Sequence, residues 1–175
     1  MSARAGETFR VARAVADIEA LLAAPLPATG PTAAQGDPVT GEWTVTEGEG
    51  FRIVPLWEGD ALDGAHGTGW DDADEAAGAR LAALVEELEG RWGAHHQVAV
   101  HAALLLRQDG AAVPPLFGAL LDEDCSGDLA AWGPVSAQGR WVGVSVGHSD
   151  WDAPLVMAAV VSDRPILAPE PPSWL

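Results

Sequence analysis

Apolar residues recur every three or four positions over two stretches of the chain, and this spacing predicts two amphipathic helices. The first helix is expected over residues 8–24 and ends before Pro25. The second is expected from Trp70 to Gly93, where a left-handed glycine would stop it. Their apolar positions are Val11, Val15, Ile18, Leu21 and Leu22 in the first helix, and Ala77, Leu81, Leu84, Leu88 and Trp92 in the second.

Other stretches alternate between apolar and polar residues, as in half-buried strands. Residues 43–46 and 51–54 flank Glu47-Gly48-Glu49-Gly50, which predicts a hairpin. A core strand is expected over residues 98–106, where one face of a period-2 pattern would carry Val98, Val100, Ala102, Leu104 and Leu106.

The C-terminal half predicts a meander of strands at residues 129–132, 140–146 and 155–161, the last of which is compatible with strand or helix. Pro114-Pro115 suits the start of a short helix through Leu121. A loop is expected at 25–41 and an irregular tail at 165–175, both rich in proline. Together these elements predict a single α+β domain over residues 1–175, with a mainly antiparallel sheet and two or three covering helices.

Composition narrows the class of protein. The chain has 175 residues, nearly half of them apolar, which is enough for one folded domain with a real core. No apolar run approaches the roughly 18 residues of a membrane span, and the first residues lack the apolar block of a signal peptide. The single cysteine, Cys125, excludes an internal disulfide. We therefore expect a cytoplasmic protein with no membrane partner and no cofactor.

The charge is strongly negative and unevenly distributed. There are 26 acidic residues against 9 basic ones, all arginine, and lysine, asparagine and tyrosine are absent, which is typical of a GC-rich genome. Codon usage does not explain clustering, however. Residues 58–90 contain ten acidic residues and one arginine, Arg80. Such a field repels nucleic acid and attracts basic proteins.

The densest acidic cluster predicts the binding site. Asp71, Asp72, Asp74 and Glu75 lie at the start of the second helix, beside Trp70. Trp151 is similarly framed by acidic residues, including Asp152. A tryptophan among carboxylates suits contact with an arginine- or lysine-rich surface, although it also suits a turn that covers the edge of the core. These seven residues predict a non-enzymatic, acidic interaction module, such as an inhibitor or immunity-type partner of a basic protein.

An enzyme is the main alternative. Gly143-Val144-Ser145-Val146-Gly147 matches the Gly-x-Ser-x-Gly nucleophile elbow, in which the serine lies on a sharp strand-to-helix turn. The only histidine after Ser145 is His148, three residues on, and few residues remain for the rest of a hydrolase sheet. A strand with small residues is the competing interpretation, and no catalytic residue is assigned.

Calcium binding is a second alternative. Asp122, Asp124, Ser126 and Asp128 have the spacing of the first half of an EF-hand loop, with Gly127 at the sixth position. The twelfth position is Gly133, where such a loop needs a bidentate glutamate, so a plain acidic turn is favoured.

The histidines do not predict a metal site. His95 and His96 would point to opposite faces of a strand, and His101 would lie about 20 Å from His95 along it. The glycine-rich residues 64–69 lead into an acidic helix start that would repel phosphate. We therefore predict neither a metal nor a nucleotide site.

Three segments carry a resemblance to known sequences. They are Glu87-Leu88-Glu89-Gly90-Arg91-Trp92-Gly93, Val113-Pro114-Pro115-Leu116 and Gly139-Arg140-Trp141-Val142-Gly143-Val144. Over roughly residues 70–161 the chain resembles short acidic proteins of GC-rich bacteria that have a helix ending in Arg-Trp-Gly and a late Gly-Arg-Trp strand. The resemblance implies an α+β domain of unknown function, and it transfers no catalytic residue.

Overall fold

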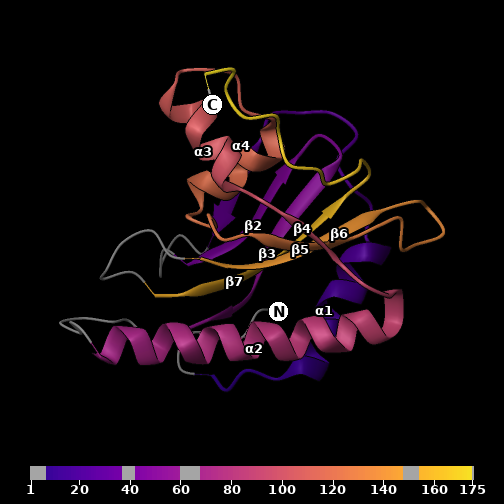
Figure 1. Ribbon diagram of the computed structural model, residues 1–175. Coiled ribbons are helices and arrows are strands. Elements are labelled where there is room, and N and C mark those ends of the chain that lie inside the picture. The colour runs from indigo at the N-terminus through magenta and orange to yellow at the C-terminus, as the bar shows by residue number, and fades with distance from the viewer. Residues whose placement is uncertain (1–6, 37–41, 60–67, 148–153, 175) are drawn as a thin grey trace.

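Seven strands form one antiparallel sheet, in the order β1-β2-β3-β7-β6-β5-β4 (Figure 1). The computed structural model describes residues 7–36, 42–59, 68–147 and 154–174. The strands are β1 (Ala33–Gly36), β2 (Trp43–Gly48), β3 (Phe51–Glu58), β4 (His96–Val98), β5 (Leu129–Trp132), β6 (Trp141–Gly147) and β7 (Val156–Ser162). The predicted hairpin is confirmed as β2–β3, and the predicted meander is confirmed as β5–β6–β7.

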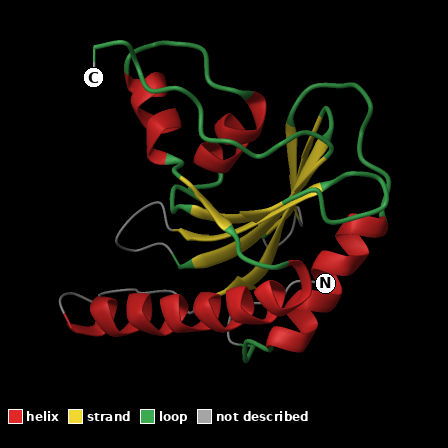
Figure 2. Cartoon of the chain, turned by 45° about the vertical axis from the view of Figure 1, so that its right-hand side comes forward, coloured by secondary structure: helices red, strands yellow, loops and turns green. Residues whose placement is uncertain are grey.

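Helices cover both faces of this sheet, as Figure 2 shows. In the described part of the chain, α1 (Val11–Ala23) and α2 (Thr68–Trp92) lie on one face, and α3 (His101–Gln108) and α4 (Pro115–Asp122) lie on the other. The predicted α+β fold with an antiparallel sheet is therefore confirmed, with four helices among the described residues where two or three were expected. No described helix is long and apolar enough to cross a bilayer.

The sheet separates two hydrophobic cores. Along β7, Met157, Ala159 and Val161 face α1 and α2, whereas Ala158 and Val160 face α3 and α4. All five side chains are fully buried. Because β7 is covered on both faces, its sequence is continuously apolar and lacks the alternation that identifies a strand with one solvated face.

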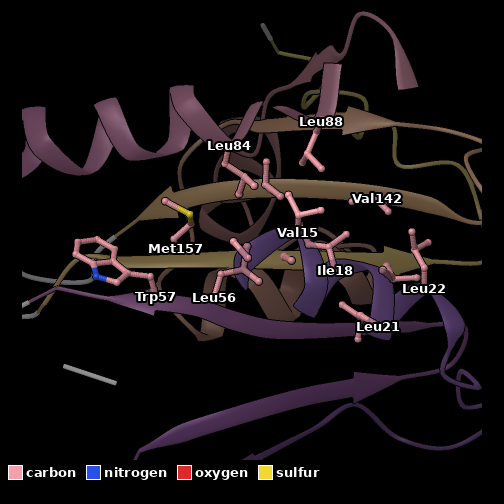
Figure 3. Close-up of a cluster of buried hydrophobic side chains, with 14 of the residues drawn as sticks. Val15, Ile18, Leu21, Leu22, Leu56, Trp57, Leu84, Leu88, Val142 and Met157 are labelled. Atoms are coloured by element: carbon pink, nitrogen blue, oxygen red, sulfur yellow. The ribbon is translucent and has the colours of Figure 1, made fainter. Parts of the chain in front are cut away.

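The larger core lies between the sheet and the two long helices (Figure 3). Leu84 and Leu88 of α2 meet Val15 and Ile18 of α1 above the sheet. The predicted apolar faces of both helices are confirmed, with Leu81, Trp92 and Val11 at the partly buried margin. Gly93 ends α2 with a φ of 84°, the left-handed conformation expected of it.

The strand predicted over residues 98–106 is wrong. Only Val98 belongs to a strand, the end of β4, and His101–Gln108 forms α3 instead. Alanine, leucine, arginine and glutamine dominate this helix and have high helix propensity. Ala103 is buried on α3, although the alternating pattern placed it on the face opposite Ala102 and Leu104. A run of alanine and leucine fits both periods, so the alternation was misleading.

The loop predicted over residues 25–41 contains a strand. Ala33–Gly36 forms β1, which pairs with β2 at the edge of the sheet and is exposed at every position. Its small and polar side chains bury nothing, so the strand depends on backbone pairing and leaves no hydrophobic pattern in the sequence. The described part of the tail, residues 165–174, contains no helix or strand, as predicted.

Candidate functional site

The first turns of α2 form an exposed acidic surface. Asp71, Asp72, Asp74 and Glu75 are all exposed, whereas Ala77, two residues further on, is fully buried. Within the described residues, none of these four carboxylates forms an ion pair. Their charge is therefore uncompensated by any described neighbour and contributes fully to the field around this end of the molecule.

The arginines of α2 lie on the flank that faces α1 and β3. Arg91 forms ion pairs with Glu19 of α1 and with Glu87. The guanidinium of Arg80 lies 4.5 Å from the ring centroid of Trp57 in β3, a cation–π contact. Both positive charges are thus engaged on one side of the helix, and the other flank has no basic residue from α2.

That other flank borders a groove beside the edge of the sheet. The groove has a volume of about 280 Å³ and lies between α2 and the strands β4 and β5. Its floor and walls are mostly apolar, and on the strand side Gln97 donates a hydrogen bond of 2.9 Å to the carboxylate of Asp128. The lining residues are Gly78, Leu81, Ala82, Val85, His95, Gln97, Asp128, Leu129 and Ala130.

The groove and most of the acidic cluster share one stripe of α2. Residues three or four positions apart lie on the same side of a helix. By this spacing Asp71, Asp74 and Glu75 lead to Gly78 and Ala82 of the groove. The stripe continues to Glu86 and Glu89 beyond it. Asp72 lies beside this stripe, next to Glu75, and its four-residue spacing leads to Ala76, which is exposed to solvent, as are Ala79 and Ala83 further along.

One end of the groove is fixed by a histidine–glutamate pair. His95 Nδ1 lies 2.7 Å from Glu89 Oε1, and its ring packs against Trp132, whose Nε1 donates a 2.8 Å hydrogen bond to the Gly93 carbonyl. The hydrogen bonds from His95 lower the pKa of the Glu89 carboxyl. Glu89 is therefore ionised at neutral pH and adds a negative charge at this end of the groove.

The Gly-x-Ser-x-Gly match is not a nucleophile elbow. Ser145 lies inside strand β6, is 1 % exposed, and donates a 2.9 Å hydrogen bond to the Gly127 carbonyl. An elbow serine has to stand on a strand-to-helix turn with its hydroxyl open to substrate. Gly143 and Gly147 fit the competing interpretation, because a Cβ at either would press on a neighbouring strand or loop. His148 lies outside the described residues.

The acidic loop after α4 does not gather its oxygen atoms around a common point. Asp122 forms an ion pair of 3.0 Å with Arg107, and Asp128 accepts its hydrogen bond from Gln97. No group of three or more histidine, cysteine or acidic side chains in the described ranges could hold a metal ion. Cys125 in this loop is buried, which raises its pKa to about 12, so its thiol is not nucleophilic at neutral pH.

The histidines near β4 diverge as expected. His95 faces α2, whereas the His96 ring lies 5.6 Å from that of Trp141, which packs against the core on the α3 side. His101 lies at the start of α3, so the spacing of about 20 Å that was expected along a strand no longer applies.

Not every residue of the predicted site can be placed. Asp71, Asp72, Asp74 and Glu75 are close together on α2, as predicted. The side chain of Trp70 lies outside the described part of the chain, as do Trp151 and Asp152. Sequence reasoning missed the groove residues His95, Gln97 and Asp128, which come from two segments far apart in the sequence. The small residues Gly78 and Ala82 lie four positions apart on an acidic stripe, and this spacing could have indicated the groove.

No family model, curated protein or solved structure matches this chain. The resemblance to short acidic bacterial proteins therefore stays an expectation.

Proposed function

We propose that this protein is a non-enzymatic, acidic interaction module that binds a basic protein, in the manner of an inhibitor or immunity partner. The observation that carries the proposal is the exposed carboxylate cluster at the start of α2, which has no ion-pair partner in the described residues. Other carboxylates, such as Glu19 and Asp122, pair with arginine. A positively charged partner would therefore form its most favourable electrostatic interactions with α2 at this cluster.

The proposed mechanism has an early and a late stage. The field of a chain with a formal net charge of −17 draws a basic protein toward the acidic end of α2. Contact then forms charge-assisted hydrogen bonds between arginine or lysine and Asp71, Asp72, Asp74 and Glu75. Because these carboxylates are exposed, they increase the association rate and its salt dependence more than they slow dissociation.

The test compares two variants with equal net charge. The first carries Asp71→Asn, Asp72→Asn, Asp74→Asn and Glu75→Gln. The control carries Glu49→Gln, Asp109→Asn, Asp163→Asn and Glu170→Gln, four exposed positions on other parts of the molecule. Each immobilised protein captures partners from the source lysate at low and moderate salt, and the association rate of any captured basic protein is then measured.

We expect wild type and control to capture the same basic protein, and the α2 variant to bind it at least ten-fold more slowly, because four exposed charge pairs are each worth about 0.2–1 kcal/mol. If no basic protein is captured at either salt concentration, or if both variants lose binding equally, the proposal is wrong.

A further inference from the structure

We infer that the groove between α2 and the β4–β5 edge is a docking site for one basic, amphipathic helix of a partner protein. This inference rests on the proposed function and adds to it a contact surface and a partner conformation. The two helices α1 and α2 do not cover the whole of their face of the sheet. On this face α1 packs over β3 and β7, and α2 packs over β6. Beyond them, β4 and the Leu129–Ala130 end of β5 line the open groove.

The width of the uncovered part of the sheet suits a single helix. Two neighbouring strands span about 10 Å, since strands lie about 4.8 Å apart, and a helix with its side chains is about 10 Å across. Gly78 and Ala82 let another helix approach α2 closely, and nothing lies within 4 Å of a Cβ added at Gly78. Leu81, Val85 and Ala130 provide the apolar surface that such a helix would cover.

The rim of the groove determines the charge of the occupant. Asp71, Asp74 and Glu75 precede the groove on its own stripe of α2, Glu86 and Glu89 follow it, and Asp128 lies on the opposite wall. The arginines of α2 are engaged on the other flank. An apolar floor with carboxylates on its rim complements a helix that has leucine-like residues on one side and arginine or lysine beside them.

The chain provides a matched pair of variants for the test. Ala82 and Ala83 are adjacent, exposed residues of α2, but only Ala82 lines the groove. Ala82→Trp fills the groove, and Ala83→Trp adds the same bulk on the solvent side. Gly78→Leu fills the groove from a second open position, so the test does not depend on one substitution.

The probe is a synthetic leucine–arginine peptide about five turns long whose heptad order makes its helix amphipathic. Its comparison peptide has the same composition with the leucines dispersed around the helix. Binding is measured by calorimetry, peptide helicity by circular dichroism, and the contact surface by chemical-shift changes of the protein's methyl groups.

We expect wild type to bind the amphipathic peptide at least ten-fold more tightly than its isomer, with a gain in helicity and shifts at Leu81 and Val85. Ala82→Trp and Gly78→Leu should each weaken binding at least ten-fold, and Ala83→Trp should leave it unchanged. If the two peptides bind with equal affinity, or if Ala82→Trp and Ala83→Trp change the affinity equally, the inference that the groove is the docking site is wrong.

Two further outcomes separate this inference from the proposed function. If Ala82→Trp and Gly78→Leu bind the amphipathic peptide as wild type does, but the variant with all four substitutions at Asp71, Asp72, Asp74 and Glu75 does not, the acidic surface binds without the groove. In that case only the inference about the groove is wrong. If the peptide binds without gaining helicity and shifts only β4, strand addition replaces helix docking and the inference is overturned. Failure of the proposed function itself appears in the lysate capture, which does not depend on the peptide.

Discussion

Individual carboxylates in this protein differ in how well they tolerate ionisation. Glu123 follows α4 and accepts a hydrogen bond of 3.4 Å from Thr46, which in turn accepts one from the Trp43 indole. Burial raises the pKa of Glu123, and the neighbouring carboxylates of Asp124 and Asp122 raise it further, although the Thr46 hydrogen bond opposes them. The ionised form of this side chain therefore costs the folded state some stability at neutral pH.

A glutamine should remove that cost. The folded-state pKa of Glu123 lies above its ordinary value of 4.5. The contribution of this group to the free energy of unfolding is therefore fully present below pH 4.5, where the carboxyl is protonated, and is lost as the pH rises through the folded-state pKa. We expect Glu123→Gln to raise the free energy of unfolding at pH 7 by about 0.2–0.5 kcal/mol, because water still screens this half-buried group.

Urea unfolding at pH 7 and pH 4 measures this effect, and the gain should disappear at the lower pH. Glu170→Gln removes the same charge from an exposed position and serves as the control. An equal gain in both variants would mean that net charge, and not the environment of Glu123, is responsible.

At the scale of elements, the predictability of each segment follows from how many of its faces are buried. α1 and α2 have one buried side, so residues such as Ile18 and Leu84 mark them clearly. β7 is buried on both faces, and its continuous apolar run predicts a strand of the meander but is also compatible with a helix. β1 is exposed on both, and it left no pattern at all. The helix α3 was mistaken for a strand because alanine and leucine satisfy either period.

The site follows the same logic. The acidic cluster is local in sequence and was predictable, since Asp71 to Glu75 occupy little more than one turn. The groove was not, because Val85, Gln97 and Asp128 meet only once α2 and two strands have packed together. The local sequence does not predict which strand becomes the edge of the sheet.

Gly78, inside α2, and Gly93, directly after its last residue, should respond to alanine substitution in opposite directions. Gly78 lies in the helix interior with open space around an added Cβ, so Gly78→Ala should raise the free energy of unfolding by about 0.5–1 kcal/mol. Gly93 has a φ of 84° and its N–H bonds to the Glu89 carbonyl at 2.8 Å, so Gly93→Ala should lower stability by about 1–2 kcal/mol.

Thermal and urea unfolding of the two variants checks both signs. A loss of stability in Gly78→Ala would mean that the folded state cannot accept even a methyl group beside the groove, and would argue against a helix approaching there.

At the scale of the whole molecule, charge repulsion opposes folding. A formal net charge of −17 on a folded chain of 175 residues brings carboxylates closer together than in the unfolded state. Raising the salt concentration from about 0.01 to 0.5 M shortens the screening length from about 30 Å to below 10 Å. We therefore expect the melting temperature to rise by about 3–6 °C.

Differential scanning calorimetry in sodium chloride measures this change. The variant that neutralises Asp71, Asp72, Asp74 and Glu75 should melt higher at low salt and respond less to added salt. A melting temperature that falls with salt would show that the ion pairs, such as Arg52–Glu47, outweigh the repulsion.

The position of β7 between β3 and β6 also governs when the molecule can be completed during synthesis. Strands β1–β3 and strands β4–β6 are made first, yet among the described strands the two sets are joined only by β7, residues 156–162. Until those residues leave the ribosome, β3 and β6 each have an unpaired edge. The apolar faces of α1 and α2 also lack the β7 side chains against which they pack. Such a nascent chain exposes apolar surface and unpaired strand edges that can aggregate, and a chain truncated before Val156 would lack the strand that joins the two parts of the sheet.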